Sequence, residues 1–241
     1  MKLQRLLSYV RQAVDDYRMI DSGDVIAVGV SGGKDSLALL YALKELQHFY
    51  PNPYTIKAIT VDLGLGNQNT GEIEQLCKSM EIEYHIVRTE IGTIIFKERH
   101  EKNPCSLCAK MRKGALNNEA LRIGCNKVAY AHHQDDAIET MLMSLIYEGR
   151  FHTFSPYTHW DKTGLSLIRP FIYIQECDII GFQNKYLLPV AKNPCPADGN
   201  TKRQYIKSML ANINRENPGV KERLFHSIIN GTLEEWNLPY S

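Results

Sequence analysis

The 241-residue sequence has no apolar segment long enough to cross a membrane, and its first residues, Met1 to Arg5, do not resemble a secretion signal. The formal net charge is only +1, so neither charge dominates and an RNA ligand would need a local basic patch. The sequence also shows no repeats of structural size and no low-complexity tracts. These absences predict a cytoplasmic protein without a membrane partner.

Cysteine is scarce, with six residues, and a reducing compartment disfavours disulfides. The thiols are therefore expected to stay reduced or to bind metal. A chain of this length can bury one large hydrophobic core.

Apolar strand-like runs alternate with segments of helical periodicity along most of the chain. Strands are predicted near residues 25–28, 56–62, 84–87, 127–131 and 165–169. Helices are predicted near residues 3–21, 37–48, 70–80, 106–124 and 135–147, whereas residues 90–104 look irregular. This alternation predicts an α/β fold with a doubly wound, parallel, five-stranded sheet. Further helices at 174–186 and from residue 201 onward predict a helical C-terminal part.

A glycine-rich segment, Gly29-Val30-Ser31-Gly32-Gly33-Lys34-Asp35-Ser36, separates the first predicted strand from a strong helix-forming run. Glycines at such a turn permit unusual backbone angles and let a ligand approach the backbone closely. The N–H groups at a helix start attract anions, and Ser31, Lys34 and Ser36 add donors. The segment therefore predicts a phosphate-binding loop.

This loop differs from the two common phosphate-binding motifs. Val28 and Asp35 stand where a Walker loop needs Gly and Ser or Thr, and Ser31 stands where the dinucleotide fingerprint needs its second Gly. The pattern Ser-Gly-Gly-x-Asp-Ser resembles the pyrophosphate loop of the N-type ATP pyrophosphatases. That resemblance implies ATP as a cofactor and transfer of AMP to a substrate oxygen. It makes Lys34 and Asp35 catalytic candidates, and it implies that the β- and γ-phosphates are held by Ser31, Gly32, Gly33, Lys34, Asp35 and Ser36.

Three predicted strands carry polar residues at or just beyond their carboxyl ends, Ser31, Asp62 and His132. Because the carboxyl ends of parallel strands share one edge of a sheet, we expect these residues to face one nucleotide-binding crevice. The segment 131–140 then opens a helix with Asp135 and Asp136, which could hold Mg²⁺ against the phosphates or simply cap the helix. Its His-His-x-Asp-Asp pattern also resembles the second motif of the N-type family. We expect nucleotide contacts from His132, Asp135 and Asp136, with Asp135 a catalytic candidate.

A third group of residues consists of cysteines. Cys105 and Cys108 are three apart at a predicted helix start, where the helix dipole favours thiolates, and Cys195 follows far downstream between prolines. Three clustered thiolates could ligate an iron–sulfur cluster or zinc, act as a sulfur relay, or be ordinary thiols. The remaining cysteines lie in or beside apolar helical patterns and are predicted to pack in the core: Cys77, Cys125 and Cys177.

The order of these motifs, together with Ile168-Arg169-Pro170 and Pro194-Cys195, resembles the tRNA 2-thiocytidine synthetase family. The resemblance covers residues 3 to 215. It implies a [4Fe–4S] cluster on Cys105, Cys108 and Cys195 with one iron free of protein ligands. It further implies a tRNA substrate, adenylation of a cytidine carbonyl (cytidine 32), and replacement of that oxygen by sulfur from a cysteine desulfurase or inorganic sulfide.

Several expectations accompany this resemblance. We expect one domain over residues 1–241, made of an N-terminal helix (1–22), a nucleotide-binding core (23–170) and a helical part (171–241) carrying Cys195, and a homodimer is possible. Lys110, Arg112 and Lys113 either meet RNA phosphates or form a solvated helix face. Two other functions stay open, a tRNA lysidine synthetase-like ligase and a non-catalytic adenine-nucleotide sensor with a structural metal.

Overall fold

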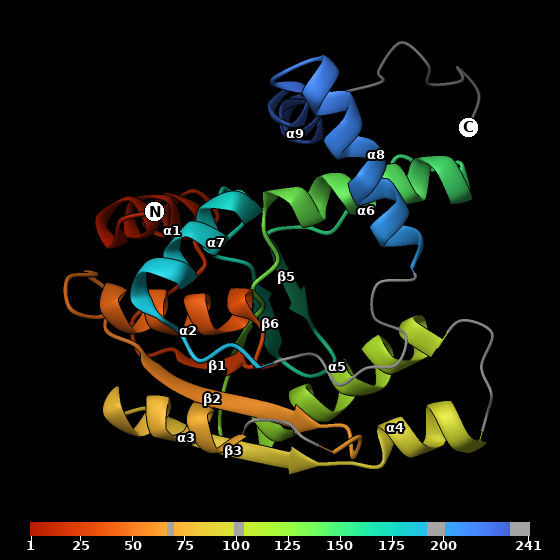
Figure 1. Cartoon of the computed structure of the whole chain (residues 1–241). Coiled ribbons are helices and arrows are strands. Elements are labelled where there is room, and N and C mark those ends of the chain that lie inside the picture. The colour runs from red at the N-terminus through yellow and green to blue at the C-terminus, as the bar shows by residue number, and fades with distance from the viewer. Residues whose placement is uncertain (67–69, 99–103, 192–200, 232–241) are drawn as a thin grey trace. The chain divides into compact units, whose positions relative to one another are not determined.

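The computed structural model describes residues 1–66, 70–98, 104–191 and 201–231, and the chain forms two compact units (Figure 1). Unit 1 comprises Met1–His133 and Ser155–Asp198, and unit 2 comprises Gln134–Phe154 and Gly199–Ser241. Unit 1 contains the described strands, whereas the described part of unit 2 forms helices. The expected single domain over residues 1–241 stays a prediction.

Unit 1 is built on one sheet with the strand order β3-β2-β1-β4-β6-β5. β1 pairs in parallel with both β2 and β4, and β2–β3 and β4–β6 are parallel as well. The order reverses between β1 and β4, and open sheets of this kind bind ligands beyond the strand ends at such a switch point. The predicted doubly wound α/β sheet is thus confirmed, with strands β1 (Val25–Gly29), β2 (Thr55–Asp62), β3 (Glu83–Arg88), β4 (Lys127–Ala129), β5 (Tyr157–Trp160) and β6 (Leu165–Ile168).

The predicted number of five strands is wrong, because β5 adds a sixth strand antiparallel to β6. This edge strand has only four residues and leaves His159 exposed, so it shows no apolar run. A tight turn connects it to β6: the N–H of Gly164, at a φ of +66°, donates to the Trp160 carbonyl at 2.9 Å. The Tyr-Thr-His-Trp composition followed by a glycine turn was the available sign of this hairpin.

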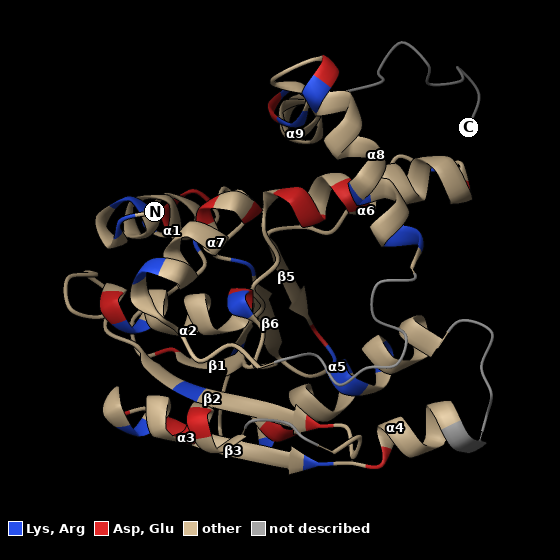
Figure 2. Cartoon of the chain, viewed as in Figure 1, with Lys and Arg blue, Asp and Glu red and all other residues tan. Residues whose placement is uncertain are grey.

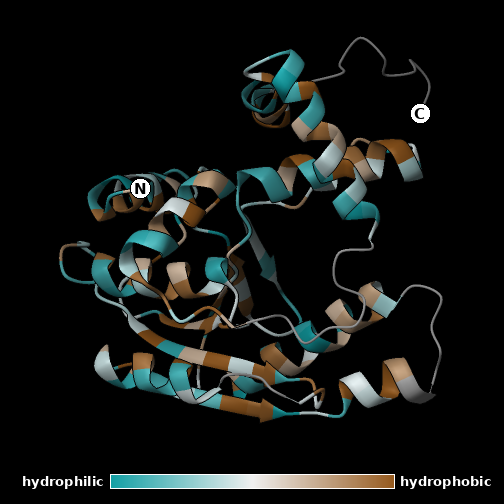
Figure 3. Cartoon of the chain, viewed as in Figure 1, coloured by the Kyte–Doolittle hydropathy of each residue, from teal (hydrophilic) through white to brown (hydrophobic). Residues whose placement is uncertain are grey.

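Helices cover both faces of the sheet in unit 1. α2 packs on β1 and β2 and is flanked by α1 and α7, whereas α5 packs on β2, β3 and β4. Apolar residues recur along β2 and β3 (Figure 3). The helices of this unit are α1 (Leu3–Asp16), α2 (Lys34–Leu46), α3 (Thr70–Ser79), α4 (Ile91–Thr93), the π-helix η1 (Ile94–Glu98), α5 (Pro104–Arg122) and α7 (Glu176–Tyr186).

The core beneath α5 explains one wrong prediction about local structure. Ala27 and Val128 from the strands cluster there with Leu116 of α5. Ile91 and Ile95 join the same cluster, four residues apart on one face of the α4–η1 segment. Residues 91–98, expected to be irregular, are therefore helical because this apolar pair anchors them to the core.

Two of the three cysteines predicted to pack in the core do so. Cys77 and Cys125 are buried, with exposed fractions of 1% and 4%. Burial raises the pKa of each thiol to about 11, so both stay protonated at neutral pH. For Cys177 the prediction is wrong: α7 buries Ile179 and Phe182, which leaves Cys177 exposed on the outer face.

Unit 2 is described here by itself. α6 (Gln134–Glu148) packs against both α8 (Lys202–Glu216) and α9 (Val220–Asn230). Its buried apolar side chains include Ile138 and Met141 of α6, Leu210 of α8 and Phe225 of α9. Within the described ranges, no helix has the length and apolar character of a membrane span.

Candidate functional site

The glycine loop leaves β1 at the switch point and is anchored on β2. The Val30 N–H donates to the Ile59 carbonyl at 2.8 Å, and the Thr60 hydroxyl donates to the Val30 carbonyl at 2.8 Å. These two bonds continue the β1–β2 ladder into the loop, so the buried sheet fixes where the loop begins.

The structure explains the need for glycine differently at the two loop positions, Gly32 and Gly33. Gly32 has a φ of +81°, in the left-handed region, where a side chain costs about 1–2 kcal/mol. A Cβ at Gly32 would also lie 3.4 Å from the Ala191 Cβ. Gly33 has an ordinary φ of −79°, and among the described residues a Cβ there would meet only the Ser31 hydroxyl, at 3.4 Å. Gly33 is therefore dispensable for the backbone but keeps the loop surface open to close approach by a ligand.

Two serines brace the loop from inside. The Ser36 hydroxyl accepts from the Ser31 N–H at 3.1 Å and donates to the Gly33 carbonyl at 2.9 Å. The Ser31 hydroxyl in turn accepts from the Gly33 N–H at 3.3 Å. The first N–H groups of a helix have no intrahelical acceptor, so those at the start of α2 can bind an anion held by this braced loop.

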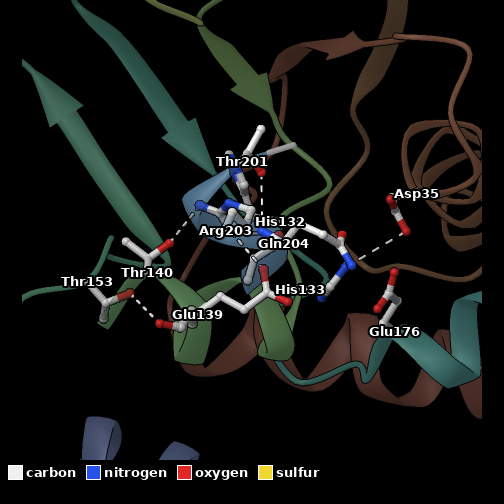
Figure 4. Close-up of polar contacts among 12 residues, drawn as sticks. Asp35, His132, His133, Glu139, Thr140, Thr153, Glu176, Thr201, Arg203 and Gln204 are labelled. Carbon is white, nitrogen blue, oxygen red and sulfur yellow. Dashed lines mark hydrogen bonds and ion pairs between the residues drawn. The ribbon is translucent and has the colours of Figure 1, made fainter. Parts of the chain in front are cut away.

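Lys34 and Asp35 belong to a polar group at the start of α2. Lys34 Nζ lies 3.2 Å from Asp35 Oδ2 and 3.1 Å from Glu176 Oε1 at the start of α7. Burial lowers the pKa of Lys34, but the two carboxylates outweigh this effect and raise it overall, so the ammonium is charged. Figure 4 shows Asp35 facing His133, whose Nε2 lies 4.0 Å from Asp35 Oδ1.

One oxygen of this group is available for a ligand. Asp35 Oδ1 is buried and accepts no hydrogen bond within the described residues. A buried carboxylate oxygen without a donor is costly, and a cation or a donor from a ligand would satisfy it. Asp35 therefore fits a role in binding either a magnesium ion or a nucleotide.

A second polar group follows β4 and β6 in unit 1. The Arg169 Nε donates to His132 Nδ1 at 3.3 Å, and its Nη1 donates to the Ser155 carbonyl. Arg169 is only 7% exposed, and burial lowers its pKa to about 10. The Tyr130 ring lies 5.8 Å from the His132 ring, and burial raises the pKa of Tyr130 to about 12.

Asp62 ends β2 as predicted. Its Oδ1 accepts from the Gly64 N–H at 2.9 Å, which turns the chain away from the strand. Ser31, Asp62 and His132 thus all follow carboxyl ends of parallel strands in unit 1. Their joint contact with a nucleotide stays a prediction.

Asp135 and Asp136 lie on the first turn of α6 and are paired with cations inside unit 2. Lys221 Nζ of α9 lies 2.6 Å from Asp135 Oδ1. Arg203 Nη1 of α8 lies 3.3 Å from Asp136 Oδ1 and 3.1 Å from Glu139 Oε2. Figure 4 shows Arg203 close to Glu139 and Thr140. The Arg203 Nη2 donates to the Thr140 hydroxyl at 3.1 Å. The two aspartates therefore also link α6 to the C-terminal helices.

The predicted cysteine site is described for two of its three residues. Cys105 and Cys108 lie on the first turn of α5, where Cys105 is exposed and Cys108 is half-buried against the core. Cys195 lies outside the described residues. Among the side chains that are described, no group of three or more His, Cys, Asp or Glu has the geometry of a metal site.

Basic residues follow the cysteines on α5, as Figure 2 shows in blue. Lys113 Nζ lies 4.4 Å from the centre of the Trp160 ring of β5, a cation–π contact. Burial and the nearby Arg169 lower the pKa of Lys113. Lys110 is exposed and Arg112 half-buried.

Sequence reasoning gave no role to two residues of these groups, Glu176 and Arg169. Glu176 stands in an ordinary helix start, and only the fold brings it to Lys34. Arg169 did carry a sign, because a charged residue directly after a buried strand and before Pro170 needs a local partner.

The sheet order and the glycine loop at its switch point define an α/β nucleotide-binding protein. Residues 4–213 match the family model described as a PP-loop domain. A tRNA-cytidine(32) 2-sulfurtransferase of Geotalea uraniireducens is 37% identical over 94% of this chain and 91% of the relative. A protein of the same name from Geobacter sulfurreducens is 34% identical over 95% of this chain and 91% of the relative.

A solved structure agrees with these sequence matches. The U34-tRNA thiolase NcsA of Methanococcus maripaludis, with its [4Fe–4S] cluster, superposes with a TM-score of 0.76 and 26% identity. The match covers 93% of this chain and 76% of the thiolase. The chain therefore belongs to the PP-loop family, and within it to the tRNA-cytidine(32) 2-sulfurtransferases, as the sequence motifs predicted.

Proposed function

We propose that this protein is an ATP-dependent tRNA sulfurtransferase that replaces the 2-oxo oxygen of a cytidine, cytidine 32, by sulfur. The observation that carries the proposal is the braced glycine loop at the switch point, open beside Gly33, in a chain 37% identical to a protein of that named activity. The same observation disfavours a tRNA lysidine synthetase-like ligase and a nucleotide sensor, because neither name occurs among these relatives.

The chemistry requires activation of a poor electrophile. The carbonyl oxygen of a pyrimidine leaves badly as oxide. It would therefore attack the α-phosphorus of ATP, releasing pyrophosphate, so that the adenylated oxygen can later depart as part of AMP. The loop residues Ser31, Gly32, Gly33 and Ser36 would hold the departing pyrophosphate, and the charged Lys34 would stabilise the negative charge that develops. A sulfide then attacks the same carbon and AMP departs with the oxygen.

Two sets of carboxylates are proposed to bind magnesium. Asp35 fits because its Oδ1 is buried without a hydrogen-bond donor in the described structure. Asp135 and Asp136 offer oxygen ligands too, but a metal there has to displace Lys221 and Arg203. Magnesium bound at either set neutralises phosphate charge. Asp62 and His132 would contact the nucleotide, and Asp135 would act in catalysis.

Cys105, Cys108 and Cys195 are proposed to hold a [4Fe–4S] cluster. The donor set fits, because thiolates are the ligands of such clusters and a helix start favours the thiolate form. When bound, the cluster supplies an iron position without a protein ligand, at which sulfide can bind. The chain's own contribution would be to keep Cys105 exposed at the start of α5.

The RNA contact and the other partners belong to the same proposal. Lys110, Arg112 and Lys113 follow the cysteines on α5 and would meet phosphates of the tRNA. A cysteine desulfurase or inorganic sulfide would supply the sulfur. We also infer a cytoplasmic protein that can form a homodimer.

The test uses anaerobically reconstituted full-length protein with tRNA, ATP, Mg²⁺ and sulfide. Nucleoside mass spectrometry should detect 2-thiocytidine, and AMP release should depend on tRNA and sulfide together. Gly33→Ala is the control that should remove both products. Lysine-dependent AMP release would instead support the ligase, and ATP binding without any product would support the sensor.

A further inference from the structure

The hydrogen bond from Arg169 to His132 determines what His132 can do. Arg169 donates through Nε, and a guanidinium has no acceptor, so His132 Nδ1 must be the acceptor. An imidazole nitrogen that accepts carries no proton. While this bond is made, the single ring proton of His132 therefore resides on Nε2 and the ring is neutral.

We propose that Arg169 is a positioning residue that holds His132 as a neutral imidazole, so that His132 donates through Nε2–H to an anionic oxygen of the nucleotide rather than acting as a general acid or base. The nucleotide part of this inference rests on the proposed function. The tautomer part does not, because it follows from the geometry of unit 1 alone.

The surroundings of His132 favour the same state. Arg169, after β6, is 7% exposed, and its guanidinium is held on its other side by the Ser155 carbonyl. A buried side chain with two fixed hydrogen bonds keeps its orientation, which a flexible surface arginine does not. His132 is thus directed by a group that cannot easily turn away.

Two basic residues of α5 lie near this pair. Arg112 of α5 acts on Tyr130 beside the His132 ring, and Lys113 of the same helix acts on Arg169. Tyr130 stays a neutral phenol, because burial raises its pKa to about 12. The next residue, His133, faces Asp35, which also pairs with Lys34, and Lys34 pairs with Glu176. A second proton on His132 would add another positive charge beside Arg169, which is unfavourable.

The position of His132 beside the glycine loop indicates which ligand its Nε2–H would bind. His132 follows β4 at the switch point, and the glycine loop follows β1, the strand paired with β4. A donor without net charge can bind a phosphate oxygen and stay bound to AMP through the reaction, since it gives up no proton. A protonated histidine at this place would repel Arg169 and break the bond that orients it.

The first experiment reads the tautomer directly, in the full-length protein without nucleotide, tRNA or cluster. Long-range ¹H–¹⁵N spectra of ¹⁵N-histidine protein are recorded between pH 5.5 and 8, with His132 assigned from its loss in His132→Gln. Ordinary imidazoles titrate near pH 6.5. We expect His132 to stay neutral with Nε2 protonated at pH 6, and to become largely protonated at that pH in Arg169→Met.

Arg122→Met is the matched control, because Arg122 is an exposed arginine of α5 paired with Glu119. It should leave the His132 signals unchanged, and His159 of β5 serves as an internal reference. A protonated His132 at pH 6 in the wild-type protein, or a proton on Nδ1, overturns the proposal. Should Arg169→Met not fold, the titration of the wild-type protein alone decides.

The second experiment tests the donor role with ATP itself, by calorimetry. Glutamine presents an N–H near the position of Nε2, whereas leucine presents none. We expect His132→Leu to weaken ATP binding about tenfold and His132→Gln less than threefold, in line with one hydrogen bond. Equal weakening by both variants contradicts the donor role. Neither the tautomer measurement nor the ATP affinity requires thiolation. A failure of the proposed sulfurtransferase function can therefore be told apart from a failure of this inference.

Discussion

At the scale of the residue, substitutions at the two loop glycines should affect different properties, ATP binding at Gly33 and stability at Gly32. Gly33→Ala should leave the free energy of unfolding within about 1 kcal/mol of wild type, because its φ is ordinary and, among the described residues, the new Cβ meets only Ser31. It should nevertheless abolish ATP binding, since the methyl group occupies the open side of the loop. Gly32→Ala should instead cost about 1–2 kcal/mol of stability, because of its positive φ.

Denaturant unfolding and ATP calorimetry on the two variants check this prediction together. Gly23→Ala, at a positive φ away from the loop, is the control for backbone strain alone, since no atom of the described part of the chain lies within 4 Å of the added Cβ. Unchanged ATP affinity in a folded Gly33→Ala protein would contradict the assignment of the loop as the phosphate site.

At the scale of the element, the cysteines on the first turn of α5 are proposed cluster ligands, whereas Cys125 is buried in the core beneath that helix. Cys105→Ala and Cys108→Ala should each lose the iron that anaerobic reconstitution introduces. Cys125→Ala should keep the iron and cost about 1 kcal/mol of stability, because Cys125 is buried and its pKa of about 11 keeps it a thiol. Iron analysis and EPR spectra of the variants check this prediction.

Cys177→Ala is the control on another helix, because Cys177 is exposed on α7 and should affect neither iron nor folding. Iron lost in Cys125→Ala, or kept in Cys108→Ala, would assign the cluster ligands to other residues.

The elements also show what a sequence can and cannot predict. The strand–loop–helix of residues 25–46 was predictable because its glycines, apolar run and helix formers are contiguous. The edge strand β5 was missed because a four-residue strand with an exposed His159 shows no apolar periodicity. Cys177 was misplaced because one helix turn has an inner and an outer face, and only packing decides which is which.

Partners distant in sequence were beyond such reasoning. Lys34 pairs with Glu176 across 142 positions, and Lys221 pairs with Asp135 across 86. Neither Glu176 nor Lys221 belongs to a local motif, so nothing in the spacing identifies them. Asp135 and Asp136 were expected either to hold magnesium or to cap a helix, from their carboxylates, their place at a helix start and their motif. Their cationic partners emerge only from the fold.

At the scale of the whole molecule, the chain consists of a sheet-bearing unit and a helical unit, and ion pairs organise the second. Lys221→Met should cost unit 2 about 2 kcal/mol, because Asp135 is 4% exposed and loses a charged hydrogen bond of 2.6 Å. Amide exchange in α9 should then accelerate, whereas exchange in β1 and β4 of unit 1 should stay as in wild type.

Exchange measured by mass spectrometry checks this prediction, with Arg215→Met on the exposed side of α8 as the control. Equal acceleration in the strands would mean that the two units unfold together, and unchanged exchange in α9 would mean that Lys221 contributes nothing to its packing.

One backbone hydrogen bond connects the glycine loop to the segment that precedes Cys195 in the sequence. The Ala191 N–H donates to the Gly32 carbonyl at 3.0 Å, and Cys195 follows four positions later in the sequence. If the loop shifts on binding the proposed pyrophosphate, this bond would also displace Ala191, from which the chain continues toward Cys195. If both proposed sites are occupied, their binding would be thermodynamically linked, and each ligand would change the affinity of the other by the same factor. The loop would thus report to the sulfur chemistry whether the activating nucleotide is in place.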